Sequence, residues 1–324
     1  MPNLDSRSSS TFAGAISPLV SHNFAIAKVL AILLVASRHF FAAPLLWIPA
    51  AVALFVFAWS SALFTTIKHS RDISVATFWL NKLRRLGLHF LLIQFFLLAL
   101  AAIRGKSGIF TWQTLVHLTG QTGWLNWFEV QDSSPLGGGL WFFTLLLIFY
   151  ATFPFLVHWQ RQARISAIIV FATLIVSLLL SAKIDVGHTL WITAAAFVVG
   201  IHCALHSIPG NAKFWATLAV AGTCCMGLLN VILKISAANV GLIVLISIAT
   251  VLWLLKTEFK LPAGPLSLLT PCILEIYLIH GYLFVRAGWP SPIEYLVSMA
   301  IIVICSFALH SAITYIESLI FSQR

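Results

Sequence analysis

Residues 23–43 read NFAIAKVLAILLVASRHFFAA, an apolar run interrupted by Lys28, Arg38 and His39. A bilayer's hydrocarbon core is crossed by a helix of about 20 mostly apolar residues, so this segment predicts a transmembrane helix. Ionisable side chains are unfavourable inside a membrane and are therefore candidate functional groups there. The same segment thus indicates that the chain lies in a lipid bilayer and that its functional residues include ionisable side chains within the membrane.

The rest of the chain has the same character. Hydrophobic residues make up 60% of the sequence and charged residues 9%, whereas charged residues make up about 25% of a soluble domain. The sequence predicts an all-α, polytopic membrane bundle of about ten transmembrane helices within a membrane domain at 23–317. The other nine predicted spans are 46–67, 86–103, 140–158, 164–181, 188–206, 213–233, 238–255, 269–287 and 295–317.

The formal net charge of +10 does not indicate nucleic-acid binding, because the basic residues lie between apolar segments rather than on a soluble domain. Lys and Arg accumulate on the cytoplasmic side of membrane proteins. Their distribution, strongest in the loop predicted at 68–85, places both termini in the cytoplasm. Residues 1–22 then form a polar cytoplasmic segment without a cleavable signal peptide, and 318–324 form a cytoplasmic tail.

The longest segment predicted outside the membrane is 104–139. Within it, 110–120 (FTWQTLVHLTG) predicts a short helix on the membrane surface, and the glycines at 137–139 predict a mobile approach to the next span. The five cysteines lie in or beside predicted spans and are interpreted as small buried apolar residues.

Lys28 and His39 are eleven residues apart in one predicted helix. Eleven α-helical steps return to within about 20° of the same face, with an axial separation of about 16 Å. Both side chains are therefore expected to face one path through the bundle. The alternative is that the Lys28 amine extends to the inner interface and His39 is a hydrogen-bonded interior histidine.

Five short motifs, taken in order, resemble those of the acyltransferase-3 family of integral membrane acyltransferases. These are Lys28 and His39 separated by ten residues, VFAWSSAL (56–63), FWLNKLRRL (78–86), LWFF (140–143) and EIYLIH (275–280). The chain departs from the family pattern at Val56, Ser61, Leu88 and Gly139. The resemblance extends over nearly the whole membrane domain.

The resemblance implies transfer of an acyl group, usually acetyl, from cytoplasmic acyl-CoA to a hydroxyl group of an extracytoplasmic glycan or lipid-linked sugar. It implies His39 as the general base, with an acyl-histidine intermediate as the other route. Lys82 and Arg85 match the family's basic pair, so they are expected to bind the donor's phosphates, together with Arg84, Lys28 and Ser60. Acyl-CoA is then a substrate, and no permanently bound cofactor is expected.

Further candidates for the pocket are Trp141, Glu275, Tyr277 and His280. Because Glu275, Tyr277 and His280 are not all on one helical face, at most two of them are expected to line one cavity. No histidine spacing predicts a metal site. His202 and His206 are four residues apart but have no acidic or cysteine partner, and they are interpreted as structural.

Two other functions fit the composition. One is a transporter or flippase of a lipid-linked sugar, in which Lys28 and His39 bind cargo; the lack of two similar halves argues against it. The other is a membrane scaffold, which leaves the two aligned side chains unexplained. The expected location is the inner or plasma membrane, with the bilayer as a partner, and a homo-oligomer is compatible with the sequence.

Overall fold

The computed structural model describes residues 17–69, 74–137, 140–184, 188–236 and 238–321, and the elements in these ranges are all helical. The polar segment up to residue 16, Arg71, Gly138, Gly139 and the last three residues lie outside them. The helices are α1 (Pro18–Phe41), α2 (Trp47–His69), α3 (Val75–Lys82), α4 (Leu88–Ile103), α5 (Trp112–Leu118), α6 (Thr122–Trp127), α7 (Trp141–Gln160), α8 (Ala163–Lys183), α9 (His188–Leu205), α10 (Ala212–Gly227), α11 (Asn239–Lys256), α12 (Leu266–Leu269), α13 (Ile273–Ile279) and α14 (Ser291–Phe321).

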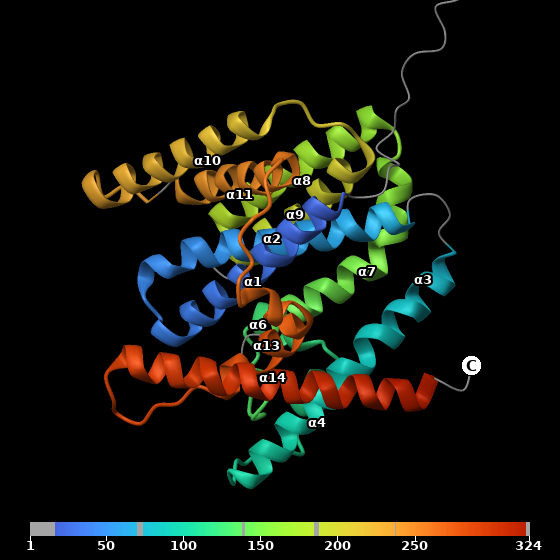
Figure 1. Cartoon of the computed structure of the whole chain (residues 1–324), viewed down its shortest axis with the longest axis vertical. Helices are drawn as coiled ribbons and strands as arrows, with labels where there is room; N and C mark the ends of the chain where they lie inside the picture. Colours follow the sequence, from blue (N-terminus) through green and yellow to red (C-terminus); the bar gives the residue numbers. More distant parts are fainter. Residues whose placement is uncertain (1–16, 70–73, 138–139, 185–187, 237, 322–324) are drawn as a thin grey trace, which may run out of the picture.

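Eight of the described helical segments are long and apolar enough to cross a membrane. The other two predicted spans coincide with shorter apolar helices, Leu190–Leu205 and Leu266–Tyr282. The long helices α2, α11 and α14 run in similar directions across the molecule, as membrane-spanning helices do (Figure 1). The prediction of a polytopic helical membrane protein is confirmed.

One predicted loop is partly helical. α3 continues through a π-helical turn at Leu83–Gly87 into α4, giving one apolar helix over Val75–Ile103. The predicted loop at 68–85 was therefore wrong from Val75 onward, because no proline or glycine precedes Gly87 to stop the helix. π turns are uncommon and occur frequently at functional sites. This one contains Arg84 and Arg85 of the basic motif.

The ninth predicted span, 269–287, is broken rather than continuous. α12 leads into a 3-10 turn at Thr270–Cys272, followed by α13 and a second 3-10 turn at His280–Tyr282. Pro271 lies in the first of these turns, where its missing N–H prevents a regular α-helical ladder. Interrupted membrane helices of this kind are tolerated where the freed backbone groups are buried in protein or line a cavity.

Close packing of α2 against α9 forms the centre of the bundle. Gly200 of α9 lies so near α2 that a Cβ atom built on it would be 2.6 Å from the carbonyl oxygen of Trp59. Small residues allow such approaches between membrane helices. Trp59 is fully buried and stacks on Phe24 of α1, with ring centroids 5.2 Å apart. α1 and α2 are thereby held together, while α10 lies at one edge of the molecule and α4 toward the other (Figure 1).

The segment between α4 and α7 contains the short helix predicted at 110–120, as α5, and a second helix, α6. The hydroxyl of Thr144 on α7 accepts a hydrogen bond from the N–H of Gly123 and donates one to the carbonyl of Gly120. His117 of α5 is fully buried between the Thr122 hydroxyl and the Asp132 carboxylate, each 2.9 Å from one ring nitrogen. The Thr144 bonds fasten the segment to α7, and the His117 bonds hold the segment itself together.

Candidate functional site

A cavity of about 750 Å³ lies between α1, α2, α4, α7, α13 and α14. On α1 its wall is formed by residues 21, 25, 28, 32 and 35, one face of the helix that extends about 21 Å along the axis. Its volume is within the range of small-molecule sites, about 300–1,000 Å³. The cavity is thus large enough for an extended organic ligand.

Three cationic side chains gather in the cavity wall: Lys28, Lys82 and Arg85. The Lys82 amine lies 4.0 Å from the centroid of the Tyr150 ring and donates a hydrogen bond to the Thr65 hydroxyl. The Lys28 amine lies 5.7 Å from the Phe64 ring centroid. None of the three forms an ion pair with a carboxylate of the described residues. Their positive charge is therefore available to an anionic ligand.

Two further residues predicted to bind the donor differ in position. Ser60 lines the cavity, and its hydroxyl also donates to the carbonyl of Phe57 in its own helix. Such bonding within a helix is common for serine. Arg84 is exposed and is not among the residues that line the cavity, although its neighbour Arg85 is.

The cavity has an aromatic end near the start of α7. Phe142 packs edge-on against Tyr277 at 5.7 Å and lies 6.2 Å from Phe57, measured between ring centroids. Tyr277, Phe142 and Phe57 all line the cavity, together with Val35 and Leu54. Trp141, another predicted pocket residue, is half-buried beside Phe142 but is not among the lining residues. The cavity is therefore basic in one part and aromatic in another.

His39 lies in the last turn of α1, one turn beyond Val35. Its side chain is exposed and is not among the lining residues, so Lys28 and His39 do not share this cavity as described. Its ring packs against the ring of His280, with centroids 5.1 Å apart. His280 is 2% exposed, and its Nδ1 lies 2.7 Å from the carbonyl oxygen of Tyr277. In a neutral ring, Nδ1 then donates to the carbonyl and Nε2 carries the free lone pair.

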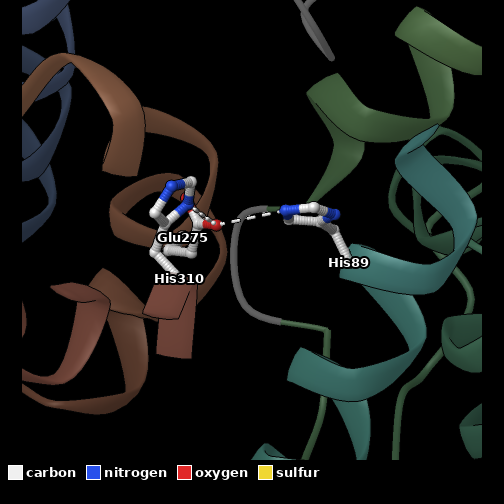
Figure 2. Close-up of side chains that lie close together, drawn as sticks. All are labelled: His89, Glu275 and His310. Carbon is white, nitrogen blue, oxygen red and sulfur yellow. Dashed lines mark hydrogen bonds and ion pairs between the residues drawn. The ribbon is translucent and has the colours of Figure 1, made fainter. Parts of the chain in front are cut away.

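The remaining pocket candidate, Glu275, lines the cavity and is 1% exposed. It lies between His89 of α4 and His310 of α14 (Figure 2). Sequence reasoning did not select these histidines, because they are far from Glu275 along the chain. One signal was present: His310 and Glu317, both lining the cavity, are seven residues apart and so share a face of α14. Of Glu275, Tyr277 and His280, the first two line the cavity and the third faces His39.

The arrangement combines a basic donor-sized cavity with an exposed imidazole one helical turn past its aromatic end. Comparison with protein-family models finds a match over residues 22–311 to a family described as an acyltransferase domain, acyltransferase-3. No curated protein and no solved structure matches the chain.

Proposed function

The chain belongs to the acyltransferase-3 family, and from this premise we propose that it transfers an acetyl group from acetyl-CoA in the cavity to a hydroxyl group of a glycan or glycan precursor. The family makes the chain a membrane acyltransferase; donor, acceptor and residue roles are the proposal. The observation that carries it is the cavity itself: it holds three cations without a carboxylate partner among the described residues, and it ends one turn from an exposed histidine.

Lys28, Lys82 and Arg85 suit the phosphate groups of coenzyme A. Charged donors bind phosphate oxygens strongly, and an arginine side chain can do so with two parallel hydrogen bonds. The Tyr150 ring and the Thr65 hydroxyl hold the Lys82 amine in place before a ligand arrives. The donor's arm then extends past Ser60 toward Val35, Phe57 and Tyr277, where the apolar walls suit a short acyl group.

His39 acts as the general base. Val35 and His39 are four residues apart, about 6 Å along α1. A thioester at the aromatic end therefore reaches the imidazole if it moves a short distance along α1 toward His39. As the hydroxyl oxygen of the acceptor attacks the thioester carbonyl, its proton passes to His39. The C–O ester bond forms, the C–S bond breaks, and the proton leaves with the coenzyme A thiolate. Exposure of His39 gives the acceptor access, and His280 orients the ring.

A label-transfer assay tests the proposal. In nanodiscs, wild type and His39→Ala are expected to bind acetyl-CoA with similar affinity, while only wild type labels an extracted glycan pool. General-base catalysis contributes about 10²–10⁴-fold, so the transfer rate of His39→Ala should fall by that amount. His206→Ala is the matched control, since the His206 ring bonds to the backbone of Gln160, away from the cavity.

Equal labelling by wild type and His39→Ala would remove the imidazole from the reaction. Label found on the wild-type chain without acceptor, released by acid or by neutral hydroxylamine, and lost in His39→Ala, would instead assign the acyl-histidine route.

A further inference from the structure

The buried Glu275 and the partly buried His89 and His310 form a cluster (Figure 2), and all three line the cavity. The three side chains come from α4, α13 and α14. Glu275 Oε1 lies 2.9 Å from His310 Nδ1 and 3.7 Å from His89 Nε2. One potential ligand atom from each residue lies within 4.8 Å of the other two. Acyl transfer as proposed above makes no use of this convergence.

The carboxylate of Glu275 is incompletely satisfied. Its Oε2 is buried and has no hydrogen-bond partner among the described residues. Glu294, also buried, shows the contrast, because its Oε1 accepts three backbone N–H groups and its Oε2 lies 3.9 Å from Arg286. A buried carboxylate without such partners is strongly unfavourable. A cation between Glu275 and the two imidazoles would remove this penalty.

The chemistry of the three ligands is that of a zinc site. Two imidazole nitrogens and one carboxylate oxygen form the protein part of known catalytic zinc sites, whose fourth position stays open. Zinc–ligand distances near 2.0–2.1 Å place neighbouring ligand atoms about 3.3 Å apart in a tetrahedron. The separations of 2.9 Å and 3.7 Å lie on either side of that value. Since all three residues line the cavity, an open position would face its interior.

A fourth residue completes the pattern. Metal-ligating histidines almost always donate their other ring N–H to a carboxylate, a carbonyl or water, which fixes the ring and its tautomer. His89 Nδ1 lies 3.2 Å from Glu317 Oε1 but is not aligned for a hydrogen bond, and His89 Nε2 lies 3.7 Å from Glu275 Oε1. A rotation of the His89 ring would let Glu317 accept the Nδ1–H and so hold His89 in the tautomer that binds a metal.

We propose that His89, Glu275 and His310 bind one divalent transition-metal ion, zinc by the class of its ligands, in the wall of the cavity, with Glu317 orienting His89. The site departs from the sequence-based expectation of no metal, which considered spacing along the chain only. The bound ion faces the interior of the cavity and places two positive charges beside the basic residues there. Its presence is independent of whether the acyl group is acetyl and of which acceptor is used.

Metal analysis of the full-length protein tests the site. Wild type, purified through a tag without histidine, is incubated with Zn²⁺, freed of unbound metal and analysed by mass spectrometry; about one ion per chain is expected. Glu275→Gln and His310→Gln should each retain less than a tenth of that. Glu317→Gln should keep the ion but weaken its affinity about 10–100-fold. A double variant of His202 and His206 to Gln is the control and should match wild type.

A second measurement guards against misfolded variants. Titration of wild type with Co²⁺ should produce visible absorption bands that Zn²⁺ abolishes. Wild type without retained zinc and without these bands would overturn the proposal, and the two histidines would then act as proton-bearing partners of Glu275. Zinc retention by folded Glu275→Gln equal to that of wild type would also overturn it. So would a loss of zinc in the His202→Gln and His206→Gln double variant equal to the loss in Glu275→Gln. Neither measurement uses acyl-CoA or acceptor, so failure here leaves the transfer reaction untouched.

Discussion

Adjacent arginines in the π turn occupy different surroundings. Arg85 lines the cavity and Arg84 does not, although both side chains are exposed. Both carry the same charge and lie in the same turn, so they would be equivalent if the turn only oriented the chain in the membrane. If the cavity binds coenzyme A, the two arginines should contribute differently to its affinity.

The residue-level prediction follows from this difference. Arg85→Ala is expected to weaken acetyl-CoA binding about 10–100-fold, because a hydrogen bond to a charged group contributes about 1.5–3 kcal/mol. Arg84→Ala should change the affinity less than twofold. Calorimetric titration at two salt concentrations measures both, and the wild-type advantage should shrink at high salt. Identical affinities for the two variants would limit this turn to a topological role.

At the same scale, the sequence could identify individual functional side chains but not which of them lie together in the fold. Lys28, Lys82, Arg85 and Ser60 were selected by motif, and all four line the cavity. His89 and His310 could not be selected, since their proximity to Glu275 arises from the packing of three helices. The sequence also does not show where the cavity ends: Val35 is the last residue of α1 that lines it, and His39 lies one turn further along the same helix.

Among the helices, the contact of α2 with α9 depends on a missing side chain. Gly200→Ala places a methyl group against the Trp59 carbonyl and the Ala62 Cβ atom, at 2.6 and 2.7 Å. Overpacking of this kind costs about 1–3 kcal/mol, so thermal unfolding in detergent should shift down by several degrees. Gly227→Ala is the control, because nothing lies within 4 Å of its added Cβ. An unshifted Gly200→Ala variant would mean that α9 is free to move away from α2.

The segment between α4 and α7 should be sensitive to acid. Burial lowers the pKa of His117 below its ordinary 6.5, although Asp132 acts in the opposite direction. The unfolded chain then binds a proton at a higher pH than the folded one, so the stabilisation is complete above pH 6.5 and is lost as the pH falls toward the lowered value.

The measurement compares wild type with His117→Gln. Wild type should unfold at a higher temperature at pH 7.5, and its advantage should shrink at pH 5.5. A difference that stays constant between these two pH values would show that His117 does not titrate in this range.

Sequence patterns predicted helices better than their ends. Long apolar runs without glycine or proline, such as that in α8, form helices close to their predicted bounds. The breaks in the ninth span were missed because proline is tolerated inside α7, at Pro154, but disrupts the ladder at Pro271. The different effects of the two prolines arise from tertiary packing, about which the pattern of one sequence gives no information. The continuation of α3 into the long apolar helix was missed because the basic residues of this segment were taken as a sign of a loop.

For the whole molecule, the orientation remains a prediction that α9 can test. Lys183 ends α8 and Lys213 begins α10, both exposed, with the short apolar helix α9 between them. In a variant with its five cysteines replaced by serine, Lys183→Cys should react with an impermeant maleimide on intact cells. Lys213→Cys should react only after permeabilisation. Reaction of both on intact cells would show that α9 does not cross the membrane.

α13 has only seven residues, yet it connects the cavity with the His39–His280 pair. Glu275 and Tyr277 border the cavity, and the next turn places His280 against His39. Because this helix is so short, a ligand that displaces one end of it should also displace the other end. Occupancy of the cavity and ligand affinity at the His39–His280 pair should then be thermodynamically linked, with each changing the other by the same factor.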